Sequence, residues 1–292
     1  KHLKMFDLLQ LLQVSKQHLS HTLEHTKFKP VPKAFKRVKD IHNHHGNNMT
    51  PNRRINILGQ MNKNGAEVVA EAFEAMRQPP WSINGGLYSS IQILDVSRPS
   101  YVRSKGIEDS GMKKLATVLA SGALANLKDL YLSGNQIGVD GMKAFSDACA
   151  KGALANLKEL NLNVNKIEDA GCAALAGACA KGALAKLTLL GLGFNNIGDV
   201  GITALADVIK PTAEGAKGAL ANLKTLYLME NKISDSGLAA LSDAFAKGAL
   251  ANLNKLYLSG NPARRDAYQK VINAIKNPEV FDYLPRVNLA IA

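Results

Sequence analysis

The chain of 292 residues is 46% hydrophobic and 21% charged, which excludes a mainly disordered protein. Its apolar runs fall well short of the ~20 residues that a membrane-spanning helix needs, so the sequence predicts that it is not a transmembrane protein. The net charge of +12 is concentrated at the N-terminus, because residues 1–54 hold eleven Lys or Arg against three Asp or Glu.

Residues 1–54 form a basic, His-rich arm that we expect to be partly helical. The first predicted helix, residues 3–28, carries leucines near helical spacing at Leu8, Leu12, Leu19 and Leu23. Three interpretations of the arm stay open. It caps the first repeat, it docks on a protein partner, or it contacts nucleic acid or another anionic surface. The last interpretation depends on a basic cluster: Lys33, Lys36, Arg37 and Lys39.

Two irregular units, 55–86 and 87–121, precede the regular part of the chain. Ile55 and Ile57 occupy strand positions in the first, and Leu94 and Val96 occupy them in the second. The loop after Val96 is longer than in the regular units and combines basic and aromatic residues: Arg98, Tyr101, Arg103 and Lys105. Partner binding and neutral variation in loop length both explain such an insertion.

From Gly122 onward the sequence repeats itself, and the same tract recurs at Gly152, Gly182, Gly218 and Gly248. Each copy reads L-x-x-L-x-L-x-x-N, followed by a short turn, a glycine and a helix rich in Ala and Leu. The last two leucines lie two residues apart, so they point to one inward face of a strand. We expect the asparagine to bond backbone groups of its own turn and of the neighbouring coil.

This pattern resembles the ribonuclease-inhibitor-like class of leucine-rich repeats, which includes repeats like those of Ran GTPase-activating proteins. The resemblance covers at least 87–276 and implies an α/β solenoid with one strand and one helix per unit. Stacked strands lie ~4.8 Å apart and packed helices roughly 10 Å, so we expect a curved parallel sheet inside and helices outside. The sequence predicts about seven units over 55–276, regular over 122–276, and a tail or cap over 277–292.

Strand residues that alternate with the inward leucines define the predicted concave face. Acidic residues gather on its first half and tyrosines on its second half. The predicted partner-binding residues on this face are Asp95, Asp129, Tyr131, Glu159, Asn161, Tyr227 and Tyr257. Tyrosine is a favoured anchor in binding surfaces, and its strand propensity explains these positions equally well. A second insertion, 211–215, follows a helix, so we expect the two insertions on opposite rims.

The sequence predicts no catalytic centre, no cofactor and no metal site. All seven histidines lie within residues 1–45, so residues 46–292 hold none for a Ser–His–Asp or Cys–His device. Three cysteines in predicted helices indicate core residues and a reducing compartment. We therefore expect an intracellular protein, cytoplasmic or within an organelle. Targeting is not readable, because the sequence starts at Lys1 and not at a Met.

These features favour a non-catalytic protein–protein interaction scaffold, a structural subunit of a larger assembly that is anchored by its basic arm. The alternative, implied by the resemblance, is a GTPase-activating or regulatory protein of the Ran GTPase-activating type. Those proteins generally carry a strongly acidic tail, whereas this chain ends in FDYLPRVNLAIA from Phe281. The scaffold is therefore the preferred hypothesis.

Overall fold

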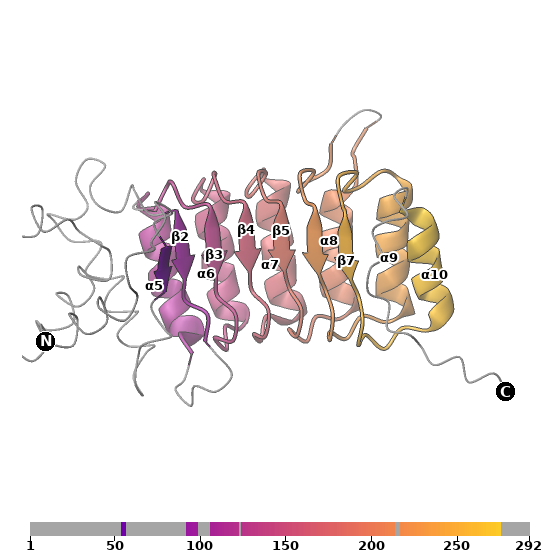
Figure 1. Cartoon of the computed structure of the whole chain (residues 1–292), viewed down its shortest axis with the longest axis horizontal. Coiled ribbons are helices and arrows are strands. Elements are labelled where there is room, and N and C mark those ends of the chain that lie inside the picture. The colour runs from indigo at the N-terminus through magenta and orange to yellow at the C-terminus, as the bar shows by residue number, and fades with distance from the viewer. Residues whose placement is uncertain (1–53, 57–91, 99–105, 123, 214–216, 276–292) are drawn as a thin grey trace, which may run out of the picture.

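The computed structural model describes residues 54–56, 92–98, 106–122, 124–213 and 217–275, which form a layer of strands in front of a layer of helices (Figure 1). Within these residues, seven short parallel strands lie in chain order in one sheet. They are β1 Arg54–Asn56, β2 Ile93–Asp95, β3 Asp129–Tyr131, β4 Glu159–Asn161, β5 Leu189–Gly191, β6 Thr225–Tyr227 and β7 Lys255–Tyr257.

Six helices of the described residues alternate with strands β2 to β7, and each packs against the next in chain order. They are α5 Glu108–Ala120, α6 Val139–Ala150, α7 Glu168–Ala180, α8 Asp199–Ile209, α9 Asp235–Ala246 and α10 Arg265–Ala274. The predicted alternation of one strand and one helix per unit is confirmed. None of these helices is long and apolar enough to cross a membrane.

The register of the sheet places equivalent leucines of successive coils side by side. Leu130 lies between Leu94 and Leu160, and Ile55 pairs with Leu94, as the irregular first unit predicted. These leucines and the helix residues Phe145, Cys149, Leu175 and Cys179 are buried in one continuous core. Truncating one such leucine to alanine typically costs 2–5 kcal/mol.

The recurrent glycine lies inside each helix and not at the turn that precedes it, which corrects the predicted helix starts. Helix α6 begins at Val139, so Gly141 belongs to its first turn. A Cβ atom at Gly141 would lie 2.6 Å from Oδ1 of Asp109 and 3.0 Å from Cβ of Met112, both in the preceding coil. Glycine is needed here because neighbouring coils approach too closely for any side chain.

The predicted asparagine ladder is present and consists of Asn135, Asn165, Asn195, Asn231 and Asn261. The side chain of Asn165 shows the pattern. Its Nδ2 donates to the carbonyls of Leu132 (3.0 Å) and Leu162 (2.9 Å), and its Oδ1 accepts from the N–H groups of Asn135 and Ile137, both at 3.0 Å. Each asparagine thus bonds two coils. Pro99, which the sequence places at an earlier rung, lies outside the described residues.

A second ladder, of aspartates, joins the first turns of neighbouring helices. Oδ1 of Asp169 accepts from the N–H groups of Gly198 (2.6 Å) and Gly201 (3.0 Å) at the start of α8. Asp109, Asp199 and Asp235 hold the starts of α6, α9 and α10 in the same way. These carboxylates satisfy N–H groups that a helix leaves unpaired at its start.

The aspartate ladder skips α7, because Val139 occupies the corresponding position in α6. The chain enters α7 differently: Glu168 has φ of 56°, and its N–H donates to the carbonyl of Asn195 at 3.0 Å. The first turn of α7 therefore takes its bond from the following coil instead of the preceding one.

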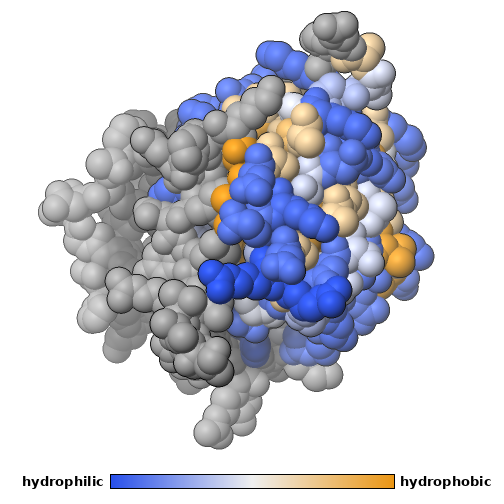
Figure 2. Space-filling model, turned by 90° about the vertical axis from the view of Figure 1, so that its right-hand side faces the viewer, coloured by the Kyte–Doolittle hydropathy of each residue, from blue (hydrophilic) through white to orange (hydrophobic). Residues whose placement is uncertain are grey.

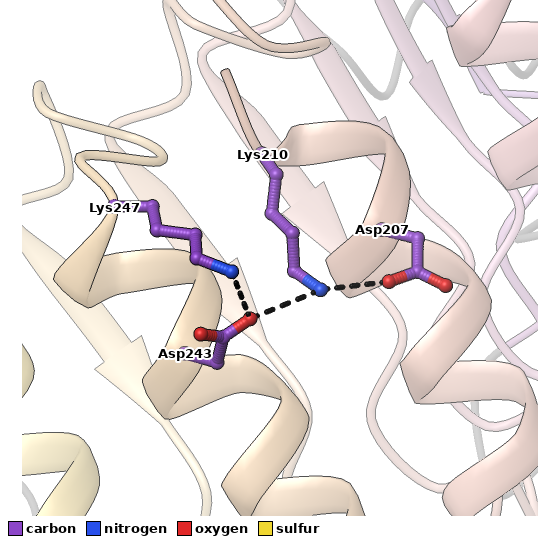
Figure 3. Close-up of polar contacts among 4 residues, drawn as sticks. All are labelled: Asp207, Lys210, Asp243 and Lys247. Carbon is purple, nitrogen blue, oxygen red and sulfur yellow. Dashed lines mark hydrogen bonds and ion pairs between the residues drawn. The ribbon is translucent and has the colours of Figure 1, made fainter. Parts of the chain in front are cut away.

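The second insertion begins where α8 ends. Lys210, which precedes Pro211, has an extended backbone (φ −62°, ψ 136°), as a residue before proline prefers. Its Nζ lies 2.8 Å from Oδ1 of Asp207 and 3.2 Å from Oδ2 of Asp243, which also contacts Lys247 at 3.0 Å (Figure 3). This network joins α8 to α9 across the base of the insertion.

Helix α10 closes the C-terminal end of the core. Its buried residues are Ala267 and Val271, and the hydroxyl of Tyr268 donates to the carbonyls of Asn261 (3.1 Å) and Leu258 (3.3 Å). Its outer side is exposed and mostly polar, and Figure 2 shows this end of the molecule as largely hydrophilic. This polar outer face is what a terminal unit of a solenoid requires. The arm, residues 1–53, and the tail, 277–292, lie outside the described residues.

Candidate protein-binding surface

The outward side chains of β2 to β7 form the surface that the sequence predicted to be concave, here called the sheet face. On its first half, Asp129 and Glu159 are paired in register on β3 and β4. The hydroxyl of Tyr131 donates to Oε2 of Glu159 at 2.5 Å. Burial, followed by the charge of Glu159, raises the pKa of Asp129. Two crowded carboxylates in partly desolvated surroundings favour the approach of a cation.

On its second half, the sheet face carries a stacked pair of aromatic rings. The rings of Tyr227 and Tyr257 lie with centroids 4.5 Å apart and planes 9° from parallel. Burial raises the pKa of Tyr227, and Tyr257 and Glu159 add to the shift. The pair is held on paired positions of β6 and β7, so both rings are fixed before any partner arrives.

The two halves meet at β5, whose outward residues are Leu189 and Gly191. Gly191 pairs in register with Asn161 on one side and Tyr227 on the other. A Cβ atom here would lie 3.0 Å from Oδ1 of Asn161 and 2.9 Å from Oδ1 of Asn163. The sheet face therefore changes from acidic to aromatic over a strand that presents one leucine and no polar side chain.

Asp95 departs from the prediction, which placed it among the exposed residues of this surface. It is only 6% exposed, and its Oδ1 accepts a hydrogen bond from the N–H of Ser97 at 3.0 Å. Asn161, which is half-buried, makes the same bond to the N–H of Asn163 at 3.0 Å. A short carboxylate or amide at this position folds back on its own strand, where a tyrosine reaches outward.

Of the basic and aromatic residues of the loop after β2, Arg98 is the one that lies within the described residues. Nε of Arg98 donates to the carbonyl of Gly134 at 2.8 Å, so this guanidinium contacts the backbone of the next coil. The other predicted binding residues of the loop and arm lie outside the described residues: Tyr101, Arg103, Lys105, Lys33, Lys36, Arg37 and Lys39.

The predicted partner-binding residues did not include three apolar residues at the end of the sheet face, here called the apolar ledge: Val164, Phe194 and Met229. Val164 is 51% exposed and Phe194 is 49% exposed. Both precede a ladder asparagine, a position that is glycine in the coils of Gly134 and Gly260. That exchange of glycine for bulky apolar residues is the signal that the sequence offered.

Metal-binding groups and cysteines were the two candidate sources of reactivity in the described residues. No group of three or more His, Cys, Asp or Glu among them is arranged to hold a metal ion. Burial raises the pKa values of Cys149, Cys172 and Cys179 to about 12, which keeps these free thiols protonated near neutral pH.

Comparison with protein-family models matches four segments of the chain, 123–146, 153–176, 183–206 and 219–242, to a model described as Leucine Rich repeat. These segments are leucine-rich repeats. They belong to the type found in ribonuclease inhibitor and Ran GTPase-activating protein, and proteins with such repeats generally bind other proteins. No curated protein matches the chain.

Proposed function

We propose that this chain is a non-catalytic protein–protein interaction scaffold that binds a partner on the sheet face as a structural subunit of a larger assembly. The observation that supports this proposal best is the fixed juxtaposition of Asp129 and Glu159 with the stacked Tyr227 and Tyr257. The asparagine and aspartate ladders make the frame beneath these side chains stiff. A stiff surface loses little conformational freedom on binding.

Tyrosine and carboxylate groups suit recognition of a protein surface that offers both cationic and apolar zones. Each tyrosine contributes a large contact area with only two rotatable side-chain bonds, and its hydroxyl bonds at the edge of the contact. An intracellular location is part of this proposal, because the three free cysteines are stable as thiols in a reducing compartment.

Affinity capture with the full chain as bait tests the proposal. The wild type, the double variant Tyr227→Ser/Tyr257→Ser and the control Ala239→Ser, on the exposed side of α9, are compared by quantitative mass spectrometry of bound proteins. We expect one partner set with the wild type and the control, and its loss with the double variant. Equal recovery of the partner set by all three baits would contradict binding on the sheet face.

The basic arm is proposed as a second contact that anchors the chain in its assembly. Its cluster Lys33, Lys36, Arg37 and Lys39 is the densest basic part of residues 1–54. Replacing all four with glutamate in the full chain is expected to weaken retention in the assembly most at low salt, since exposed charges are screened as ionic strength rises. Retention that is unchanged at every salt concentration would contradict an electrostatic anchor.

The second candidate function is regulation of a small GTPase. The observation that favours it is a hollow of about 430 Å³ at the rim where strands lead into helices, between Asp109, Val139, Lys166 and Glu168. Proteins of the Ran GTPase-activating type act from this rim. Turnover assays of candidate small GTPases with the full chain test it, and the absence of stimulation would remove it.

A further inference from the structure

Both the backbone conformation and the solvent exposure of residues in the apolar ledge are unfavourable for folding. Val164 and Phe194 have φ of 57° and 58°, a backbone region that side chains with bulk at Cβ rarely adopt. Their side chains are also about half exposed, so burial does not compensate for the strain. Coils with Gly134 and Gly260 form the same turn without this cost. Glu230 has the same backbone conformation in the next coil, so Val164 and Phe194 are set apart by exposed apolar bulk on two neighbouring coils, and that bulk points to a function for these side chains.

The two residues occupy equivalent positions on neighbouring coils. Val164 N–H donates to the carbonyl of Gly193, and Phe194 N–H donates to the carbonyl of Met229, both at 2.9 Å. A Cβ atom at Gly193 would lie 2.6 Å from Sδ of Met229, so the methionine side chain extends over this glycine, whose carbonyl accepts from Val164. Met229 follows Tyr227 by two residues on the same face, so the ledge continues into the tyrosine pair.

Charge on the sheet face decides what kind of segment fits beside the ledge. Asp129 and Glu159 stand at the opposite end of the strands, and Val164 follows Glu159 by five positions. Extended backbone rises ~3.3 Å per residue, and β4 ends at Asn161, so the carboxylates lie at most roughly 17 Å from the ledge along the strand direction. An extended peptide covers that span with about five or six residues.

We infer that the apolar ledge and the Asp129–Glu159 pair together bind an extended segment of a partner protein, in which a large apolar side chain follows or precedes a basic side chain by about five residues. This inference rests on the proposed function, because it names the chemistry of the partner that the sheet face receives. The apolar side chain contacts Phe194, Val164 and Met229. The basic side chain lies against the two carboxylates.

The test is an array of short synthetic peptides, each with one Leu or Phe and one Arg, Lys, Asp or Glu at varied separations, probed with the full chain. We expect binding to peptides that pair an apolar with a basic residue at about the predicted separation. Affinities of the selected peptide are then measured for variants. Phe194→Gly should weaken binding at least about tenfold, as loss of an apolar anchor does.

The matched control is Glu230→Gly, which replaces the residue at the same turn of the next coil, where φ is 52°. It should leave affinity within about twofold of the wild type. Phe194→Gly should not lower the melting temperature, because glycine accepts this backbone without strain. The double variant Asp129→Asn/Glu159→Gln should lose the preference for basic over neutral peptides. Together these results separate loss of contact from loss of fold.

Several outcomes would overturn the inference. They are selection of acidic peptides, selection of no peptide, wild-type affinity in Phe194→Gly, or a dimer that Phe194→Gly dissociates, which would make a second copy the occupant. If Phe194→Gly keeps the captured partner set while Tyr227→Ser/Tyr257→Ser loses it, the inference about the apolar ledge is wrong and the scaffold proposal stands. If neither variant loses it, both proposals fall.

Discussion

The buried side of the solenoid and its exposed sheet face are made by the same coils, yet they differ in how closely one coil repeats the next. On the buried side, leucine follows leucine in register, and every rung from Asn135 to Asn261 carries the same amide. On the exposed side, the residue before that amide runs Gly134, Val164, Phe194, Glu230, Gly260.

The difference separates what stacking requires from what it leaves free. A ladder asparagine serves two coils, so every coil must offer it to the next. The residue before it faces outward and contributes no side-chain bond to the ladder, so stacking does not require one residue type there, although a side chain at this turn strains the backbone. Bulky residues at a turn that favours glycine are therefore better explained by a partner than by the fold.

The sharpest test of the repeated side is Asn165→Ala, for which we expect the largest loss of stability. The change leaves the N–H groups of Asn135 and Ile137 and the carbonyls of Leu132 and Leu162 without this partner in the core. We expect unfolding in urea to show a loss of about 3 kcal/mol, since buried groups that lose partners carry the full desolvation cost. Asn254→Ala, at an exposed position, is the control and should change little. Equal effects of the two would contradict the ladder.

The aspartate ladder predicts a smaller loss at Asp169 and none at Asp140, which lies one residue after the ladder position of its own coil. Asp169→Ala removes both bonds to the start of α8 and should cost about 1–2 kcal/mol, as loss of a helix cap does. Asp140 is shifted by one residue, is exposed and contacts Lys113 at 3.0 Å. Asp140→Ala should therefore leave the thermal midpoint unchanged. A loss of stability that is larger in Asp140→Ala than in Asp169→Ala would contradict the role assigned to the aspartate ladder.

A gain of stability is expected where the buried side departs from its own repeat. Oγ of Ser146 is, among the residues that the structure describes, the one buried side-chain oxygen without a hydrogen-bond partner. Alanine stands at this position in α5 and α7, at Ala116 and Ala176. Ser146→Ala should raise the free energy of unfolding by about 1 kcal/mol, because it removes an unsatisfied polar group. A loss of stability on this change would mean that the hydroxyl has a bond in solution.

The smallest expected effect lies on the sheet face and depends on pH. The pKa of Asp129 is raised above its ordinary value of 3.8, so the folded chain holds this proton more tightly than the unfolded chain. Stability from this group is present below pH 3.8 and is lost as pH rises through the folded pKa. Asp129→Asn should therefore be slightly more stable than the wild type at neutral pH and equal to it in acid. Thermal midpoints of both proteins across this pH range measure the difference, and a gap that widens in acid would contradict it.

The repeated side of the molecule could be predicted from the sequence, but only part of the exposed side could. The leucines, Asn135 and its equivalents were predictable because their period is regular, so one copy explains all others. The role of Asp169 was not predicted from the sequence, because Val139 stands where the neighbouring coils carry the equivalent aspartate. The burial of Asp95 depends on a side chain that bends back to the N–H of Ser97, which no periodicity encodes. Phe194 stands where two other coils have glycine, and the meaning of that exchange depends on its backbone angle, which favours glycine.

The central claim is that the partner covers the sheet face and its apolar ledge, and hydroxyl-radical footprinting of the full chain alone and with its captured partner measures this directly. Oxidation of Phe194, Met229 and Tyr227 should fall strongly in the complex. Val200, which is 70% exposed at the start of α8, should be oxidised equally in both samples. Protection of Val200 with unchanged oxidation of the other three would place the partner on the helices and contradict the account.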